Sequence, residues 1–347
     1  PKMDKQEEIY TQAMQYLDDA IADLQKEDLI DPEAQDLLYQ GDAEKWLKLA
    51  YGLKARYTMH LLKRSANKDA DMEKVLEYVN NSFESAEEQA AFDVYDANNI
   101  NPLYGFFVAR AGLGASESMR SKLAEYNDPR LSRAFITKQG TSGKEQAPGT
   151  ADNAVYAPNG TPEQGTSKYG TSLFMYSISA PTLLLSYHEL KFLEAEALCR
   201  LGRDAKSALK DAVVAGLLNA ESSFSVSRKE LGKTLINPAS SITDTEAESY
   251  FDNTVEAKYT AEPLKTTMTQ KYFALWGASG EATESYNDVR RMKGLGENFI
   301  ELKNPNSFPL RCPYGNSDTT TNAEVKAAYG NGQYVYSENV WWAGGSR

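Results

Sequence analysis

Apolar residues recur every three or four positions along the first 90 residues, which is the spacing of one helix face. Three helices are predicted there: residues 4–26, residues 42–65, and a third from Asp69 onward. Asp4 with Glu7 resembles a capping box, and Asp42 and Asp69 are placed to cap the next two helices. Asp31-Pro32 breaks the chain between the first two. The second apolar stripe is Trp46, Leu49, Leu53, Tyr57 and Leu61, and the third is Met72, Val75, Leu76 and Val79.

Helical spacing returns at Thr182 and predicts a hairpin that reaches Ala220 and turns at Leu201-Gly202. Alanines on both sides of the turn allow close helix packing, which is typical of one tetratricopeptide unit. Further helices are predicted at residues 245–259, capped by Thr245, at 263–276 and at 281–293. The helical pairs follow no fixed period, so a regular solenoid is not expected.

The chain from residue 91 to residue 180 is rich in Gly, Asn, Pro, Ser, Thr and Tyr. A short helix at 116–125 and a strand at 134–137 are predicted in it, and residues 139–172 are expected to form long loops. Compact domains keep such loops mainly where they have a function. The last 50 residues are also expected to be loops, with Trp341-Trp342 anchoring the end on the body.

The predicted fold is therefore mainly α, with about half of the chain in helices and very little strand. Tetratricopeptide-like helical pairs form a scaffold, a loop-rich irregular subdomain is inserted in it, and the C-terminal part is loop-rich. The expected parts are residues 1–90 and 181–347 as scaffold and residues 91–180 as the insertion, together one unit.

The charge balance limits the partners. A net charge of -12 leaves no basic face for phosphates, so no nucleic acid partner is predicted. No apolar run is long enough to span a membrane. The chain begins at Pro1 without an export signal, and we expect a further N-terminal portion, with any anchor, to lie upstream.

The cysteines and histidines favour neither a disulfide framework nor a metal site. Cys199 and Cys312 do not make a framework, and no Cys/His spacing fits zinc. His60 and His188 lie on predicted helices and are interpreted as structural. Asp93 and Asp96 could offer oxygens to calcium, but the EF-hand spacing is absent. No metal and no cofactor is predicted.

Motifs for catalysis are missing, because the chain has no G-x-S-x-G, P-loop, H-E-x-x-H or G-x-G-x-x-G sequence. Glu281, Glu284 and Asp288 follow helical spacing and could supply the two carboxylates that a glycosidase holds about 5–10 Å apart. With 49 acidic residues such spacing is commonplace, so the protein is not expected to be an enzyme. Arg290 and Arg291 could grip a carboxylate, but pairing with neighbours such as Asp288 is favoured.

The residues suit binding better. Glycan recognition uses aromatic faces for the sugar ring and polar side chains for its hydroxyls. Two turn-rich segments of the insertion supply both kinds. The predicted ligand-binding residues are Tyr95, Asp96, Asn98, Asn99, Asn101 and Tyr104 in the first segment, and Tyr156, Asn159 and Tyr169 in the second.

Six segments, in order, resemble the SusD/RagB family of outer-membrane nutrient-binding lipoproteins of Bacteroidetes. Residues 44–59 are similar to its W-x-K-x-A-N-x-L-x-x-R helix, with Tyr51 and Gly52 replacing the usual small residue and Asn. The other matches are Asp128-Pro-Arg-Leu131, the Y-x-E-x-x-F-x-x-A-E-A helix at 186–197, Gln270-Lys-Tyr272, the segment Tyr286-Asn-Asp-Val-Arg-Arg291, and Arg311-Cys-Pro-Tyr314 followed by Asn322 and Trp341-Trp342.

The resemblance implies a non-catalytic protein at the cell surface, held on the outer membrane by a lipid anchor upstream of this chain. Its helical scaffold would pack on a SusC-like TonB-dependent transporter, and its irregular subdomain would bind an oligosaccharide or another nutrient. Two alternatives stay open. The helical pairs could form a tetratricopeptide-type adaptor that holds a peptide on a concave face, or a helical carbohydrate-active enzyme.

Overall fold

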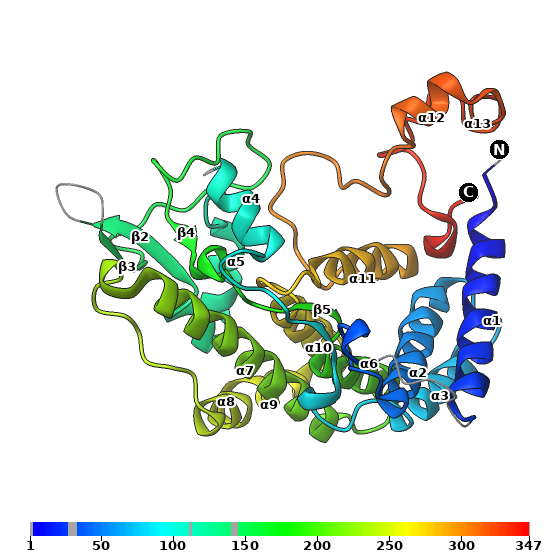
Figure 1. Cartoon of the computed structure of the whole chain (residues 1–347), viewed down its shortest axis with the longest axis horizontal. Coiled ribbons are helices and arrows are strands. Elements are labelled where there is room, and N and C mark those ends of the chain that lie inside the picture. The colour runs from blue at the N-terminus through cyan, green and yellow to red at the C-terminus, as the bar shows by residue number, and fades with distance from the viewer. Residues whose placement is uncertain (1–2, 27–32, 111–112, 140–144, 347) are drawn as a thin grey trace.

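The computed structural model describes residues 3–26, 33–110, 113–139 and 145–346. Its body is a stack of helices (Figure 1): α1 (Gln6–Leu24), α2 (Ala43–His60) and α3 (Lys68–Asn80) on one side, then α6 (Tyr187–Arg200), α10 (Pro263–Ala274) and α11 (Ala282–Leu295), with the long α7 (Lys206–Leu231) on the other. The contacts between helices follow the chain: α1 packs on α2, α2 on α3, α3 on α6 and α6 on α7. The prediction of a mainly helical scaffold is confirmed.

Two apolar cores hold the stack together. One lies between α2, α3 and α6 and contains Met59, Met72, Val75, Leu190 and Leu193, all at most 1% exposed. The larger lies around α7 and includes Phe174, Phe192 and Phe224. Gly52 allows α2 to approach its neighbours, because a Cβ at this position would lie 2.4 Å from Leu185 Cδ2. The departure from the family pattern at Gly52 therefore has a packing reason.

Several predicted helix ends need correction. Asp42 caps α2 by accepting the Lys45 N–H, as predicted. The capping box at Asp4 and Glu7 is wrong, because α1 begins after Lys5 and no side chain caps it. Asn67, not Asp69, caps α3, and Thr243, not Thr245, caps the later helix. The predicted break at Asp31-Pro32 lies outside the described residues.

The helical hairpin also starts and ends elsewhere than predicted. Residues Thr182–Leu185 form strand β5, which pairs antiparallel with β1 (Ala90–Phe92), and α6 begins after the cap Ser186. α7 runs to Leu231, past the predicted end at Ala220. The β1–β5 pair joins the two ends of the insertion. The division at residues 90 and 180 stays a prediction.

The insertion contains more regular structure than its composition suggests. α4 (Pro102–Arg110) was not predicted, whereas α5 (Glu117–Glu125), which Ser116 caps, was. The predicted strand is β2 (Phe135–Gln139), and it lies between β3 (Glu145–Pro148) and β4 (Thr171–Ser172) in an antiparallel sheet. β3 and β4 lie within the stretch expected to be loops, which corrects that prediction in part.

The C-terminal third contains α8 (Asp244–Tyr250), a π-helical turn (Phe251–Val255) and α9 (Glu256–Ala261), where one helix was predicted. The tail, expected to be loops, also forms α12 (Asn316–Thr321) and α13 (Ala323–Tyr329), which project from the body in Figure 1. Trp342 is 4% exposed and stacks on His60 at 5.5 Å, so the predicted anchoring of the end is confirmed.

Candidate functional site

A cavity of about 700 Å³ lies between α5, α10 and two loop segments. Its lining mixes hydroxyl, amide, charged and aromatic side chains. The lining residues are Glu117, Ser118, Ser121, Lys122, Glu125, Tyr126, Pro158, Asn159, Lys265, Thr269, Phe273, Asn298, Phe299, Ile300, Glu301 and Lys303. Only Asn159 among them belongs to the predicted binding residues.

α5 presents a polar face to this cavity. Ser118, Ser121, Lys122 and Glu125 are spaced like one side of a helix, whereas Met119 and Leu123 face the core. The cap Ser116 holds the start of the helix through the Met119 N–H and also donates to Asn159 Oδ1 at 3.0 Å. One hydroxyl therefore ties the second predicted loop to the helix that lines the cavity.

α10 supplies a second wall, one residue per turn, with Lys265, Thr269 and Phe273. Phe273, itself fully buried, packs edge-on against the Tyr126 ring at 5.3 Å between centroids, so Tyr126 and Phe299 are the aromatic side chains accessible at the cavity. Burial raises the pKa of the Tyr126 hydroxyl. This tyrosine therefore stays protonated and can both donate and accept a hydrogen bond.

The third wall is residues 298–303, which follow α11 without regular structure. α11 ends at Gly296, whose φ of 82° requires the left-handed conformation that glycine adopts readily. Glu297 then accepts two hydrogen bonds from Arg200, at 2.8 and 2.9 Å, and Ile300 packs into a small core with Met268 and Met292. Both contacts fix Asn298 and Phe299 at the cavity.

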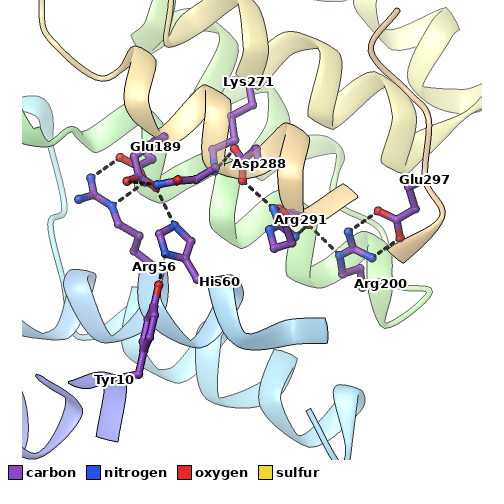
Figure 2. Close-up of polar contacts among 12 residues, drawn as sticks. Tyr10, Arg56, His60, Glu189, Arg200, Lys271, Asp288, Arg291 and Glu297 are labelled. Atoms are coloured by element: carbon purple, nitrogen blue, oxygen red, sulfur yellow. Dashed lines mark hydrogen bonds and ion pairs between the residues drawn. The ribbon is translucent and has the colours of Figure 1, made fainter. Parts of the chain in front are cut away.

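A buried charge network extends from the Arg200–Glu297 contact through the helical stack (Figure 2). Arg291, fully buried, donates to Glu196 Oε2 at 2.8 Å and to Asp288 Oδ1 at 2.7 Å, and Lys271 Nζ lies 2.8 Å from Asp288. Arg200 bonds to Glu196 as well as to Glu297. Burial alone would raise the pKa of Glu196, but the charges of Arg291 and Arg200 outweigh it and hold the pKa far below its usual range.

Arg291 is structural, as favoured from the sequence. Arg290 also contacts its own neighbourhood, namely the Asn287 side chain and the rings of Tyr286 and Trp342. The predicted pairing of Arg291 with Asp288 is confirmed, whereas the acidic partner expected for Arg290 is replaced by Asn287 and two aromatic rings.

The two histidines lie in the same framework. His60 Nε2 is 2.7 Å from Glu284, and its Nδ1 is 3.2 Å from the Tyr10 hydroxyl, so α1, α2 and α11 meet at one ring. His188 Nε2 lies 3.1 Å from Glu281, with both side chains 1% exposed. Their structural interpretation is confirmed.

The carboxylates of the enzyme alternative are therefore occupied. Glu281 faces His188 and the Ser186 N–H, Glu284 faces His60, and Asp288 faces two cations. Burial opposes ionisation of Glu281 and Glu284, yet the neighbouring cationic and hydrogen-bonding groups lower the pKa of both. All three carboxylates are therefore held by cationic or hydrogen-bonding partners inside the helical stack.

The first predicted loop uses most of its polar groups internally. Asp96 accepts the backbone N–H groups of Asn98 and Asn99 at 2.7 Å, and Asn99 donates to the Val94 carbonyl. Asn101 is 1% exposed, accepts the Leu103 and Tyr104 N–H groups at the start of α4, and donates to the Ala180 carbonyl. Asn98 is exposed.

The two tyrosines of that loop contact other elements. The Tyr95 hydroxyl lies 3.0 Å from Thr182 Oγ1, and the Tyr104 hydroxyl donates to Glu230 at 3.2 Å. Burial, followed by the charge of Glu230, raises the pKa of Tyr104.

The second loop lies beside α5. The Tyr156 ring packs against Phe135 with the Arg120 guanidinium 5.2 Å from its centre, and Tyr169 is 8% exposed. Among the described residues no hydrogen bond, ion pair or ring contact joins the two loops. The structure therefore places Tyr156 and Asn159 against the α5 segment, through Arg120 and Ser116, and leaves the first loop separate. All nine residues stay predictions as ligand contacts.

Sequence reasoning missed Lys122, Asn298 and Phe299. The polar spacing on the helix at 116–125 was a usable signal, but it is equally that of a solvated face. Nothing local in residues 298–303 indicates that they meet α5. Within the described chain, no group of three or more His, Cys, Asp or Glu side chains is arranged to hold a metal ion.

Comparison with known proteins now adds the family. A family model described as SusD-like, starch-binding and associating with the outer membrane matches residues 1–314. This chain belongs to the SusD-like family. No functionally curated protein matches it. Among the residues that the structure describes, no helix has the length and apolar character needed to cross a membrane.

Solved structures agree on the fold. A SusD/RagB family protein from Bacteroides thetaiotaomicron is 67% identical over 100% of this chain and 74% of its own, with a TM-score of 0.96. A SusD homologue from Bacteroides fragilis is 20% identical over 99% of this chain and 76% of its own, with a TM-score of 0.73. A chitin-binding protein is 20% identical over 99% and 74%, with a TM-score of 0.69. At 20% identity these last two show the fold alone.

Proposed function

We propose that this SusD-like protein binds an oligosaccharide or a related nutrient at the cell surface without altering it, and passes it to a TonB-dependent outer-membrane transporter. The observation that carries the binding proposal is the cavity of about 700 Å³, whose lining pairs aromatic rings with amides, hydroxyls and charges. Sugars need this combination, because their ring faces are apolar and their edges are polar. The family's description as starch-binding supports the same ligand class.

The absence of catalysis is part of the proposal. Glu281, Glu284 and Asp288 are neutralised inside the charge network. Of the three carboxylates at the cavity, Glu301 pairs with Lys303, and Glu117 accepts from Ser121 and lies 3.6 Å from Arg120. Glu125 is exposed on α5. The hydrogen bond and charge of Lys303 lower the pKa of Glu301, which opposes the proton-donating role that glycoside hydrolysis requires. Incubation with any glycan that binds should return it unchanged by chromatography, and product formation would contradict this part.

The binding site is tested by competing variants. A glycan array identifies the ligand, and calorimetry then compares Asn159→Ala, at the cavity, with Asn98→Ala and Tyr104→Ala in the first loop. Loss of a direct hydrogen bond should weaken binding by about tenfold, or about 1.4 kcal/mol, in Asn159→Ala. The matched control Asn81→Ala, at the end of α3, should bind as wild type.

Weaker binding in Asn98→Ala or Tyr104→Ala, with Asn159→Ala unchanged, would move the site to the first loop. If no glycan binds, the ligand class is wrong.

Delivery to a transporter has a separate test. Full-length protein, expressed with the outer-membrane proteins of its source, should co-purify with a TonB-dependent transporter after mild detergent extraction. Recovery of the lipid-anchored protein without any such transporter would contradict the partner but leave glycan binding intact.

One observation favours the adaptor alternative. A groove of about 490 Å³ follows α7 and is lined by apolar Val214, Ala215 and Leu218, with Lys210 and Asp211 among its polar residues. Helical grooves of this kind hold peptides in other architectures. Selection from a peptide library that depends on Leu218 would support an adaptor role.

A further inference from the structure

The ammonium group of Lys122 differs from the other cations around the cavity. Its Nζ donates to Ser118 Oγ at 2.8 Å and has no carboxylate within ion-pair distance among the described residues. Lys265 bonds to Glu262 at 2.8 Å, and Lys303 bonds to Glu301. Lys122 is therefore the cavity lysine whose charge has no anionic partner.

Three other shielded lysines among the described residues are each neutralised by a carboxylate. Lys54, Lys191 and Lys271 contact Asp18, Glu194 and Asp288 respectively. Burial would lower the pKa of these three lysines, but their partners outweigh it and raise the pKa. For Lys122, burial lowers the pKa, and the more distant charges of Glu301 and Glu125 do not reverse the shift.

The carboxylates near Lys122 do not form an ion pair with its ammonium group. Glu301 is engaged with Lys303, and Glu117 is hydrogen-bonded to Ser121. Glu125 lies one turn along α5 and is exposed. A partly buried ammonium with unused donors is costly in free energy, and a bound anion removes that cost through a charge-assisted hydrogen bond.

We propose that the cavity takes an acidic sugar and that Lys122 binds its carboxylate or sulfate group. This inference rests on the proposed function and narrows its ligand to glycans that bear an anionic group. The polar face of α5 places the Ser118 and Ser121 hydroxyls next to Lys122, and Asn159 and Asn298 line the same cavity for the sugar hydroxyls. The protein's overall charge of -12 repels anions, so such a preference has to come from a local cation.

The test is an array of oligosaccharides in matched pairs: uronic acid oligomers against their methyl esters, and sulfated against unsulfated oligomers of the same backbone. Calorimetry then compares wild type, Lys122→Gln, Lys122→Arg and the control Lys74→Gln, whose lysine is exposed on α3. For at least one pair the acidic form should bind about tenfold or more tightly than its neutral partner, as expected for one charge-assisted contact. Lys122→Gln should remove this preference, whereas Lys122→Arg and Lys74→Gln should keep it.

Preference for uronates identifies a carboxylate, and preference for sulfated oligomers identifies a sulfate. If neutral glycans bind at least as tightly as their acidic partners, or the preference survives in Lys122→Gln, the inference is wrong while glycan binding stands. If no member of the array binds, the proposed function fails with it.

Discussion

Arg291 is a single residue that neutralises two buried carboxylates, Glu196 and Asp288. We expect Arg291→Met to destabilise the fold by about 3–5 kcal/mol, because both acids lose a partner inside the protein. Arg203→Met is the control, since Arg203 pairs with Glu73 at the surface and such pairs contribute about 0–1 kcal/mol. Urea unfolding measures both, and a similar effect of the two variants would contradict the structural role of the network.

At the residue scale, the sequence allowed part of the site to be predicted. Asn159 was predicted as a ligand contact because amides in a turn-rich segment near aromatic residues suit sugars, and the structure places it at the cavity. Lys122 was not predicted, because a helical lysine beside serines is normally solvated. What distinguishes Lys122 from the other two lysines that line the cavity is its missing carboxylate partner. The sequence does not reveal this, because the cavity is built from segments that lie far apart in the chain.

At the element scale, the approach of α2 to its neighbours depends on Gly52. A Cβ there would lie 2.4 Å from Leu185 Cδ2 and 2.7 Å from Ser82 Oγ. Gly52→Ala should therefore cost about 1–3 kcal/mol through overpacking, although alanine favours helices.

Gly105→Ala is the matched control for this prediction, because a Cβ at that position meets only the flexible Ile100 side chain. It should be neutral or stabilising by up to about 1 kcal/mol. Thermal unfolding measures the stability of both variants. A Gly52→Ala variant as stable as wild type would contradict the claim that α2 needs a glycine to pack against its neighbours.

The C-terminal turn is the second element with a clear prediction. The Trp342 ring stacks on His60 and lies 5.0 Å from the Arg290 guanidinium, and the Trp342 backbone N–H donates to the Gln6 side chain. Trp342→Ala should speed hydrogen exchange at residues 340–345 and in the first turn of α1, with α7 unchanged. Trp341→Ala, which removes a half-buried ring, should have a smaller effect; equal or absent changes would contradict the anchoring role.

Helices of the scaffold could be predicted because their apolar stripes are local signals. Their ends were less predictable, since several candidate caps lie close together, as Asn67 and Asp69 do. β5 was misassigned because a short apolar run fits either a strand or a helix, and its partner β1 lies about 90 residues earlier. α4 was missed because its only buried residue is Phe107.

For the whole molecule, the buried charge network makes the free energy of unfolding depend on pH. The folded-state pKa values of Glu196, Glu281 and Glu284 lie below that of an unfolded glutamate, near 4.3. Their contribution is therefore complete above that pH and is lost as the pH falls through the folded values. Glu189 acts in the opposite sense, because burial raises its pKa despite Arg56.

Unfolding free energy should accordingly be steady near neutral pH and fall steeply below about pH 4. Replacing one of these acids, as in Glu284→Gln, should make that fall shallower. Stability that rises towards low pH would contradict this account of the network.

The charge network also connects the scaffold to the cavity, since Arg200 holds Glu297 just before the wall at residues 298–303.

The most direct test of the central claim is a crystal structure of the protein with the glycan that binds most tightly in the array. The account predicts sugar density between α5 and α10, with hydrogen bonds to Asn159 or Asn298 and an acidic group at Lys122. Density at the first loop, around Asn98 and Tyr104, with the cavity empty would contradict it.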